Sequence, residues 1–230
     1  MRMETAIDFG AFIHHTEVFD FIGEFTIFRG QAVKGNLVPS IARMNAAADT
    51  TEQEKRQLAQ LRLLGASLIP DTDASDLELL ILAQHFGLKT RLLDWTSNPL
   101  AALWFACAST HPGDTYVYAL DADNLLAEDV YKKGPFNTSE TRVVQPRLSN
   151  ARIIAQHSWF TLHQYSAESK EFVRLESDSA TENRLTEIQI PAGSRADVLR
   201  SLDRHGISSR TLFPDLQGLC QHLNWRYPGA

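Results

Sequence analysis

The chain has 230 residues, of which 43% are hydrophobic and 22% are charged, and its formal net charge is −6. These values are ordinary for a soluble globular protein whose core is large enough to fold without covalent staples. The negative charge argues against a broad nucleic-acid surface, although it leaves room for a local basic groove.

Targeting segments and metal sites are not indicated. No apolar run is long enough for a signal peptide or a membrane span, so we expect a cytoplasmic protein without a membrane partner. The two cysteines, Cys107 and Cys220, fall on predicted helix faces among apolar neighbours, and we expect both to be buried free thiols. No Cys/His spacing is typical of zinc, so we expect no metal.

The first predicted elements are a helical segment and a strand. Residues 6–23 carry apolar residues at helical spacing and predict a helix or helix pair that ends at Gly23. Residues 25–31 predict a strand because they combine aromatic and β-branched residues, and Gly30 ends it. Arg29 therefore lies at the mouth of this strand, where it either forms a surface ion pair or contacts a ligand.

A loop and a long helix follow. Residues 37–43 indicate a loop with a short helical turn, in which Arg43 is a second candidate contact for an anion. Residues 51–54 form a capping-box pattern, which starts a helix that runs to about Ile69. One leucine stripe of this helix faces the core, and it comprises Leu58, Leu61, Leu64 and Leu68.

The centre of the chain places a polar strand end between two helices. A second capping box at residues 75–78 opens a helix that ends near Gly87, and residues 90–93 predict a short buried strand. A further helix begins at Asn98 and Pro99. The residues between strand and helix are Asp94, Trp95, Thr96 and Ser97. Their hydroxyls and carboxylate could meet a ligand at the helix N-terminus, or they could simply cap the helix, which is the commoner role.

The second half of the chain predicts short strands, loops and two helices. Strands are predicted at residues 114–120, 151–157, 159–163, 185–190 and 209–213. Helices are predicted at residues 194–204 and 215–224, and loop-rich segments at 124–150 and 168–183. No domain boundary is visible, so we expect one α+β domain over residues 1–230. Its helical elements at 1–23 and 51–87 would pack on a mixed sheet of short strands with flanking helices.

Several stretches together resemble the pattern of one family. They are residues 28–31, residues 37–43, and residues 84–87 with 90–96. This pattern is similar to that of the FRG domain family, a group found in bacteria and phages. The blocks at residues 152–161 and 212–215 are similar to its downstream part. The resemblance covers most of the chain and implies a single FRG domain.

A second resemblance, to ADP-ribosyltransferase folds, implies chemistry. A strand ending in Arg, then a strand ending in Thr-Ser, then a helix is similar to the layout of those enzymes and implies an ADP-ribosyltransferase-like core with NAD as substrate. Arg29 would then grip a phosphate or ribose of NAD, since a forked guanidinium suits a diphosphate. Thr96 and Ser97 would hold the nicotinamide pocket together. The nucleotide contacts expected from both resemblances are Arg29, Gly30, Gln31, Arg43, His85, Arg91, Asp94, Thr96 and Ser97.

The third position of that layout, a glutamate on a later strand, has two candidates here. Gln156 falls in the expected block, but it cannot supply negative charge to a developing cation, a loss on the order of 10²–10³ in rate. Glu187 is either the catalytic carboxylate or a plain solvent-facing strand residue. His85 and His157 could act as acids, bases or stacking groups, or could serve structure alone.

Three hypotheses remain open. The first is an NAD-using ADP-ribosyltransferase or NAD glycohydrolase-like enzyme that passes ADP-ribose to a protein, a nucleic acid or water, as suits a toxin or phage-defence effector. The second is a nucleotide- or nucleic-acid-binding module without turnover. In the third, Asp94 binds Arg91 or backbone amides and keeps the strand-helix corner rigid. The sequence contains no phosphate-binding loop or serine-nucleophile elbow, and nothing near Cys107 would make it a nucleophile.

Overall fold

The computed structural model describes residues 1–21, 25–71, 73–127, 129–138, 140–147 and 150–228, so the helix end expected at Gly23 lies outside the described residues. Its centre is a seven-stranded sheet with the strand order β1-β9-β4-β2-β3-β6-β5. The strands are β1 (Arg2–Thr5), β2 (Thr26–Gln31), β3 (Leu92–Thr96), β4 (Thr115–Asp121), β5 (Arg142–Val144), β6 (Ser158–Leu162) and β9 (Leu185–Ile190). β1 runs parallel to β9, and the other neighbouring pairs are antiparallel.

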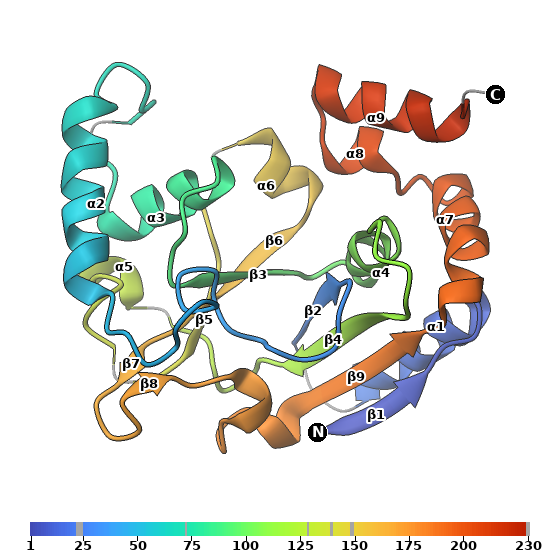
Figure 1. The fold of residues 1–230 in the computed structure, drawn as a ribbon, viewed down its shortest axis with the longest axis horizontal. Helices are drawn as coiled ribbons and strands as arrows, with labels where there is room; N and C mark the ends of the chain where they lie inside the picture. Colours follow the sequence, from blue (N-terminus) through green and yellow to red (C-terminus); the bar gives the residue numbers. More distant parts are fainter. Residues whose placement is uncertain (22–24, 72, 128, 139, 148–149, 229–230) are drawn as a thin grey trace.

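A second, two-stranded sheet consists of β7 (Tyr165–Ser166) and β8 (Glu171–Phe172). The α-helices are α1 (Phe9–Glu17), α2 (Thr51–Leu64), α3 (Asp76–His85), α4 (Pro99–Cys107), α5 (Val130–Lys133), α6 (Ala151–Ala155), α7 (Arg195–Arg204), α8 (Ser209–Leu212) and α9 (Leu216–Arg226). Short 3-10 turns are η1 (Val18–Phe21), η2 (Leu175–Ser177), η3 (Glu182–Arg184) and η4 (Ala192–Ser194). Figure 1 shows α2 and α3 at one end of the sheet and α1 and α7 at the other. The mixture confirms the α+β class.

The helix-covered face of the sheet carries two separate apolar cores. Phe28 pairs with Thr96 across β2 and β3, so these two side chains lie on the same face of the sheet. Every second residue along each strand lies on that face as well. Phe28, Val117 and Ile188 pack under α1, α4 and α7. Leu92 and Phe160 pack under α3 at the other end. The polar residues of β3 and β6 that lie between these two cores are therefore placed where helices do not cover them completely.

Helix signals in the central stretch hold as predicted. Ser75 forms a capping box with Glu78 at the start of α3, and Gly87 just beyond its end adopts a left-handed φ of +93°. The side chain of Asn98 accepts hydrogen bonds from two backbone N–H groups of α4, and Cys107 is buried on the core face of that helix. These caps fix both helices that flank β3.

Two predicted strands are helices. Residues 151–157 form α6 and a turn, because the Asn150 side chain accepts a hydrogen bond from Ile153 N and starts a helix. Residues 209–213 form α8, which Ser208 opens with a capping box. Both segments are too short for their periodicity to separate a helix from a strand, and the polar cap before each one decides.

Four further predictions need correction. The capping box at residues 51–54 is not formed, because Glu54 binds Arg91 and the helix N-cap is Thr50. The helix ends at Leu64 and not near Ile69, since Gly65 follows it. β3 begins at Leu92, two residues later than expected. Cys220, expected to be buried, is exposed.

Candidate nucleotide-binding pocket

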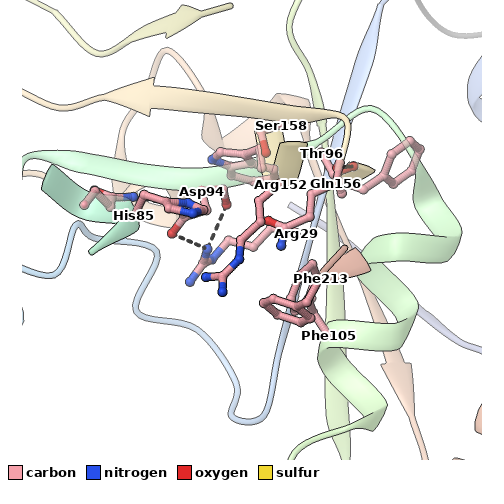
Figure 2. Close-up of a pocket in the computed structure, with 13 residues that line it drawn as sticks. Arg29, His85, Asp94, Thr96, Phe105, Arg152, Gln156, Ser158 and Phe213 are labelled. Atoms are coloured by element: carbon pink, nitrogen blue, oxygen red, sulfur yellow. Dashed lines mark hydrogen bonds and ion pairs between the residues drawn. The ribbon is translucent and has the colours of Figure 1, made fainter. Parts of the chain in front are cut away.

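A cavity of about 350 Å³ opens between the two cores of the helix-covered face (Figure 2). Its walls come from β2, β3, β6, α3, α4, α6 and the segment after α8. The lining residues are Phe28, Arg29, Gly30, Gln84, His85, Asp94, Trp95, Thr96, Phe105, Arg152, Gln156, Ser158 and Phe213. Residues from four of the sequence blocks singled out above therefore meet in one place.

The cavity lies where strands β2 and β3 separate. These two strands pair at a single register position, Phe28 with Thr96, and the side chain of Arg29 enters the gap beyond it. Arg29 Nη1 donates a hydrogen bond to Asp94 O at 2.7 Å, and its Nε donates to Gln31 Oε1 at 3.3 Å. Burial lowers the pKa of Arg29 to about 10, so the guanidinium remains a cation at neutral pH.

Arg152 is a second guanidinium in the same cavity, and it is not among the residues predicted for the site. It comes from α6, and Figure 2 shows it beside Arg29. Its Nε and Nη2 donate to Asp215 Oδ2 at 3.1 Å and 2.5 Å, and its guanidinium lies over the Phe213 ring at 5.4 Å. Arg152 holds the pKa of Asp215 below its usual value. Arg152, Phe213 and Asp215 all lie in the two downstream blocks, at residues 152–161 and 212–215, so the sequence did indicate that these segments matter.

Two phenylalanines form an apolar wall of the cavity. The rings of Phe105 and Phe213 lie 6.1 Å apart in an edge-to-face arrangement, and Trp104 contacts both from behind. Figure 2 shows both phenylalanines below the two arginines. Aromatic faces beside guanidinium groups suit a ligand that combines a planar ring with an anion.

Asp94 is the carboxylate of this cavity among the described lining residues. Its Oδ1 accepts a hydrogen bond from Gln84 Nε2 at 2.7 Å, its Oδ2 lies 3.9 Å from Arg29 Nη1, and its side chain is 64% exposed. His85 lies beside it. Burial, together with the charge of Arg152, lowers the pKa of His85, so its ring is neutral at pH 7.

Gly30 serves packing. A Cβ at this position would lie 1.8 Å from the backbone oxygen of Ala102 and 2.6 Å from Ala106 N. The glycine therefore lets α4 lie directly against β2. Phe28, two residues earlier on β2, is buried in the core below that helix. Of the Phe-Arg-Gly triplet, only Arg29 points a polar group at the cavity.

Thr96 and Gln156 line the cavity, but their side chains already form hydrogen bonds with backbone groups of the protein. Thr96 Oγ1 donates to Gln156 O at 2.7 Å and accepts from Asn98 N at 2.9 Å. Gln156 Nε2 donates to Leu212 O at 3.0 Å. The capping interpretation of the Thr-Ser-Asn segment is therefore the better one for Thr96, whose hydroxyl ties β3 to α4 and α6.

Five of the residues proposed for the site do not line the cavity: Gln31, Arg43, Arg91, Ser97 and Glu187. Gln31 donates to the backbone oxygens of Val33 and Gly35. Exposed Arg43 donates from Nε to Val38 O at 3.5 Å. Ser97 meets the neighbouring turn through its backbone N–H, which donates to His157 O. His157 itself is exposed, has a left-handed φ of +48°, and does not line the cavity.

Glu187 lies away from the cavity and is buried, so neither of its two expected roles, a catalytic carboxylate in the site or a solvent-facing strand residue, agrees with its position. Its side chain is 3% exposed. It accepts a hydrogen bond from Tyr118 Oη at 2.9 Å and pairs with Lys34 Nζ at 2.9 Å. Tyr118 Oη in turn accepts from Gly35 N, so Glu187 stabilises the loop that follows β2.

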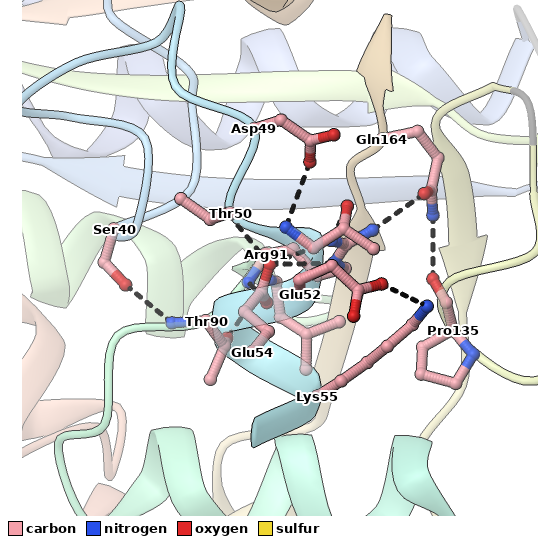
Figure 3. A network of polar contacts seen from close by, with 12 residues as sticks. Ser40, Asp49, Thr50, Glu52, Glu54, Lys55, Thr90, Arg91, Pro135 and Gln164 are labelled. Carbon is pink, nitrogen blue, oxygen red and sulfur yellow. Dashed lines mark hydrogen bonds and ion pairs between the residues drawn. The ribbon is translucent and has the colours of Figure 1, made fainter. Parts of the chain in front are cut away.

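Arg91 is also outside the cavity, in a buried network (Figure 3). Its Nε and Nη2 donate to Glu54 Oε1 at 3.1 Å and 2.9 Å, and its other N–H groups donate to Gln164 and Thr51. The Phe136 ring lies 4.5 Å from its guanidinium carbon. Arg91 therefore joins α2 to the sheet. The expectation that Asp94 binds Arg91 is wrong, because each has another partner.

Other chemistry finds little support within the described residues. They contain no cluster of three or more His, Cys, Asp or Glu that could hold a metal ion. Burial raises the pKa of the Cys107 thiol to about 11, so it stays protonated. None of the helices within the described residues is both long enough and apolar enough to cross a bilayer.

Comparison with known families supports the first resemblance. The FRG domain model matches residues 24–115, and this segment supplies Arg29, Gly30, His85, Asp94 and Thr96 to the cavity. No curated protein and no solved structure matches the chain.

Proposed function

We propose that this chain, which carries an FRG domain, binds a nucleotide in the cavity around Arg29 and that NAD is its substrate. The observation that carries the proposal is the pair of guanidinium groups, Arg29 and Arg152, beside the rings of Phe105 and Phe213 (Figure 2). Guanidinium groups bind phosphate oxygens through forked N–H donors, and aromatic rings bind the face of a base.

The charges of the cavity are arranged so that a phosphate can enter. Arg29 is tied to a backbone oxygen through one Nη, and Arg152 is tied to Asp215, whose side chain is 37% exposed at the rim. A phosphate oxygen can therefore replace Asp215 as the partner of Arg152 at little cost, because solvent screens a partly exposed ion pair and leaves it weak. The volume of about 350 Å³ suits one half of a dinucleotide, with the other half outside.

Turnover would proceed at the N-glycosidic bond of NAD. The bond between the ribose C1 and the nicotinamide nitrogen breaks, and nicotinamide leaves with the bonding electron pair. Water or a macromolecular nucleophile then adds to C1 and loses a proton. Asp94 would stabilise the positive charge on the ribose, because it is the carboxylate in the cavity, whereas Glu187 lies elsewhere and Gln156 carries no charge.

A second candidate function is nucleotide binding without turnover. The observation that favours it is the double engagement of Asp94, which accepts from Gln84 at 2.7 Å and faces Arg29 at 3.9 Å. Both contacts engage the negative charge of the Asp94 carboxylate, so less of that charge is left to stabilise a positive charge on the ribose. A nucleic-acid ligand is less favoured than a mononucleotide, since Arg91 is buried in its own network and does not extend a basic track from Arg29.

Release of nicotinamide separates the two candidates. The purified chain is incubated with NAD, with and without cell lysate or nucleic acid, and free nicotinamide and ADP-ribose adducts are followed. Asp94→Asn keeps the shape of the side chain and removes its charge, so it should abolish release and retain NAD binding. Arg142→Ala removes a partly exposed arginine on β5 outside the cavity and serves as control. If the wild type binds NAD but releases no nicotinamide, nucleotide binding without turnover is the function that remains.

A further inference from the structure

An apolar groove lies between α2 and α3, at the end of the sheet opposite α7 (Figure 1). Its volume is about 950 Å³. Its apolar walls include Leu61, Leu64, Leu68, Ile69, Leu82 and Phe86. The described part of the chain supplies nothing that fills this groove, so these side chains meet solvent.

Several of these side chains are far more exposed than large apolar residues usually are. The exposed fractions are 75% for Leu64, 82% for Leu68 and 81% for Phe86. Of the leucine stripe expected to face the core, Leu58 is 2% exposed and Leu61 packs against the same core while partly buried, whereas Leu64 and Leu68 do not face the core. Contiguous exposed apolar surface of this kind marks an interaction site more often than single exposed leucines do.

The groove shares a sequence block with the nucleotide pocket. Gln84 and His85 line the pocket, whereas Phe86 and Gly87, the next two residues, line the groove. Phe86 does not line the nucleotide pocket, and its ring, 81% exposed, contacts only the edge of that site through an edge-to-face contact with His85 at 5.4 Å. A second binding event accounts for an exposed phenylalanine at this position.

The charge of the groove identifies the kind of partner. Its lining contains Arg56 and no carboxylate, and an adjoining hollow contributes Lys89, again without a carboxylate. Neither cation takes part in an ion pair among the described residues, although the chain as a whole carries a net charge of −6. The lining of the groove and of the adjoining hollow is thus apolar with two basic residues and no carboxylate, which complements an apolar stripe with an acidic flank.

We propose that the groove binds an amphipathic helix of another protein, with apolar residues at i, i+3 or i+4, and i+7 and with acidic residues along one flank. Two helices flank the groove, and ridges of a third helix pack between them. α2 has 14 residues, so it extends roughly 21 Å, enough to contact about four turns of the partner. The bound helix would touch the turn that also carries Gln84 and His85, and so lies next to the nucleotide pocket.

Fluorescence anisotropy with three labelled 18-residue peptides tests the proposal. One peptide is an amphipathic helix with an acidic flank, the second has the same apolar stripe with a basic flank, and the third is a scrambled version of the first. We expect the acidic-flank helix to bind at least 10-fold more tightly than either of the others. Arg56→Glu with Lys89→Glu should reverse the preference between the two flanks.

The matched variants use exposed leucines at the C-terminal end of α2 and in the turn that follows it. Leu64→Ser with Leu68→Ser removes groove side chains that are 75% and 82% exposed, and should abolish peptide binding without loss of folding. Leu63→Ser removes a leucine that is 71% exposed but does not line the groove, and should bind as the wild type does. Equal binding of all peptides, no binding of any, or self-association of the chain through this face that the double variant removes would each overturn the proposal.

Discussion

Arg29 Nη1 donates a hydrogen bond to Asp94 O at 2.7 Å, and the Asp94 carboxylate lies 3.9 Å from the same nitrogen. These residues are 65 positions apart, in two different sequence motifs, and they meet where β2 and β3 stop pairing. The contact holds the guanidinium at the cavity and closes the gap between the strands. Arg29→Lys therefore keeps the positive charge but loses the forked N–H donors of the guanidinium. The variant separates ligand binding that needs these donors from binding that needs only a positive charge.

Gly30 and Gly87 should respond differently to the same small change. Gly30→Ala drives a methyl group into the backbone of α4 and should cost roughly 3 kcal/mol or more of unfolding free energy, since the helix must shift. Gly87→Ala meets no atom within 4 Å but is strained at a φ of +93°, which costs about 1–2 kcal/mol. Urea denaturation of both variants measures the difference. Equal losses would contradict the packing role assigned to Gly30.

Arg91 should affect stability and leave the ligand site intact. Arg91→Met leaves Glu54 buried without its partner, so we expect a loss of about 3–5 kcal/mol in unfolding free energy. Replacing both residues, as Arg91→Met with Glu54→Gln, should recover part of that loss because no unpaired charge remains. NAD affinity per folded molecule should equal that of the wild type. A specific loss of affinity in a folded Arg91→Met protein would show that Arg91 binds ligand after all.

The buried histidine His163 should make stability depend on pH. Burial, together with the charges of Arg29 and Arg91, lowers its pKa to about 3, whereas the unfolded chain protonates it near pH 6.5. Between these values the unfolded state binds more protons, so stability falls as the pH falls. From pH 7.5 to 5.5 the His163 contribution should drop by about 1.4 kcal/mol. Denaturation at both pH values should show this loss in the wild type, and a His163→Gln variant that loses as much would refute the assignment.

Asp215 should compete with a bound phosphate for Arg152. Asp215→Asn removes the charge that holds Arg152, while the amide can still cap α9 as the carboxylate does through Gly218 N. We expect NAD to bind up to about 5-fold more tightly, because the partly exposed ion pair with Asp215 no longer opposes it. Calorimetric titration at low and moderate salt provides the comparison. Weaker binding would mean that Asp215 positions Arg152 for the ligand and does not compete with it.

Caps and turns were the part of the fold that the sequence predicted best. Ser75, Asn98 and Gly87 act through neighbours within three or four residues, so the local pattern contains the whole interaction. The two helices mistaken for strands, α6 and α8, are five and four residues long. Over such lengths helical and strand periodicity coincide, and only Asn150 and Ser208 before them carried the correct signal.

The residues that line the candidate cavity were predicted only in part. Arg29 and Asp94 were found because they lie in a recognisable motif, but so do Gln31 and Arg91, whose polar groups the fold uses elsewhere. Sequence position cannot separate these roles, because burial and partners are decided by segments far away in the chain. Arg152 was missed for the same reason, as its place beside Arg29 depends on how α6 packs.

Calorimetric titration of NAD into the chain tests the central claim most directly, with Arg29→Ala, Arg152→Ala and the control Arg142→Ala measured in parallel. Each cavity arginine should contribute charge-assisted hydrogen bonds of about 1.5–3 kcal/mol, so we expect each of these two variants to bind roughly 10- to 100-fold more weakly. Arg142→Ala should bind as the wild type does. Absence of NAD binding in the wild type, or equal affinity in Arg29→Ala, would contradict the assignment of this cavity as a nucleotide site.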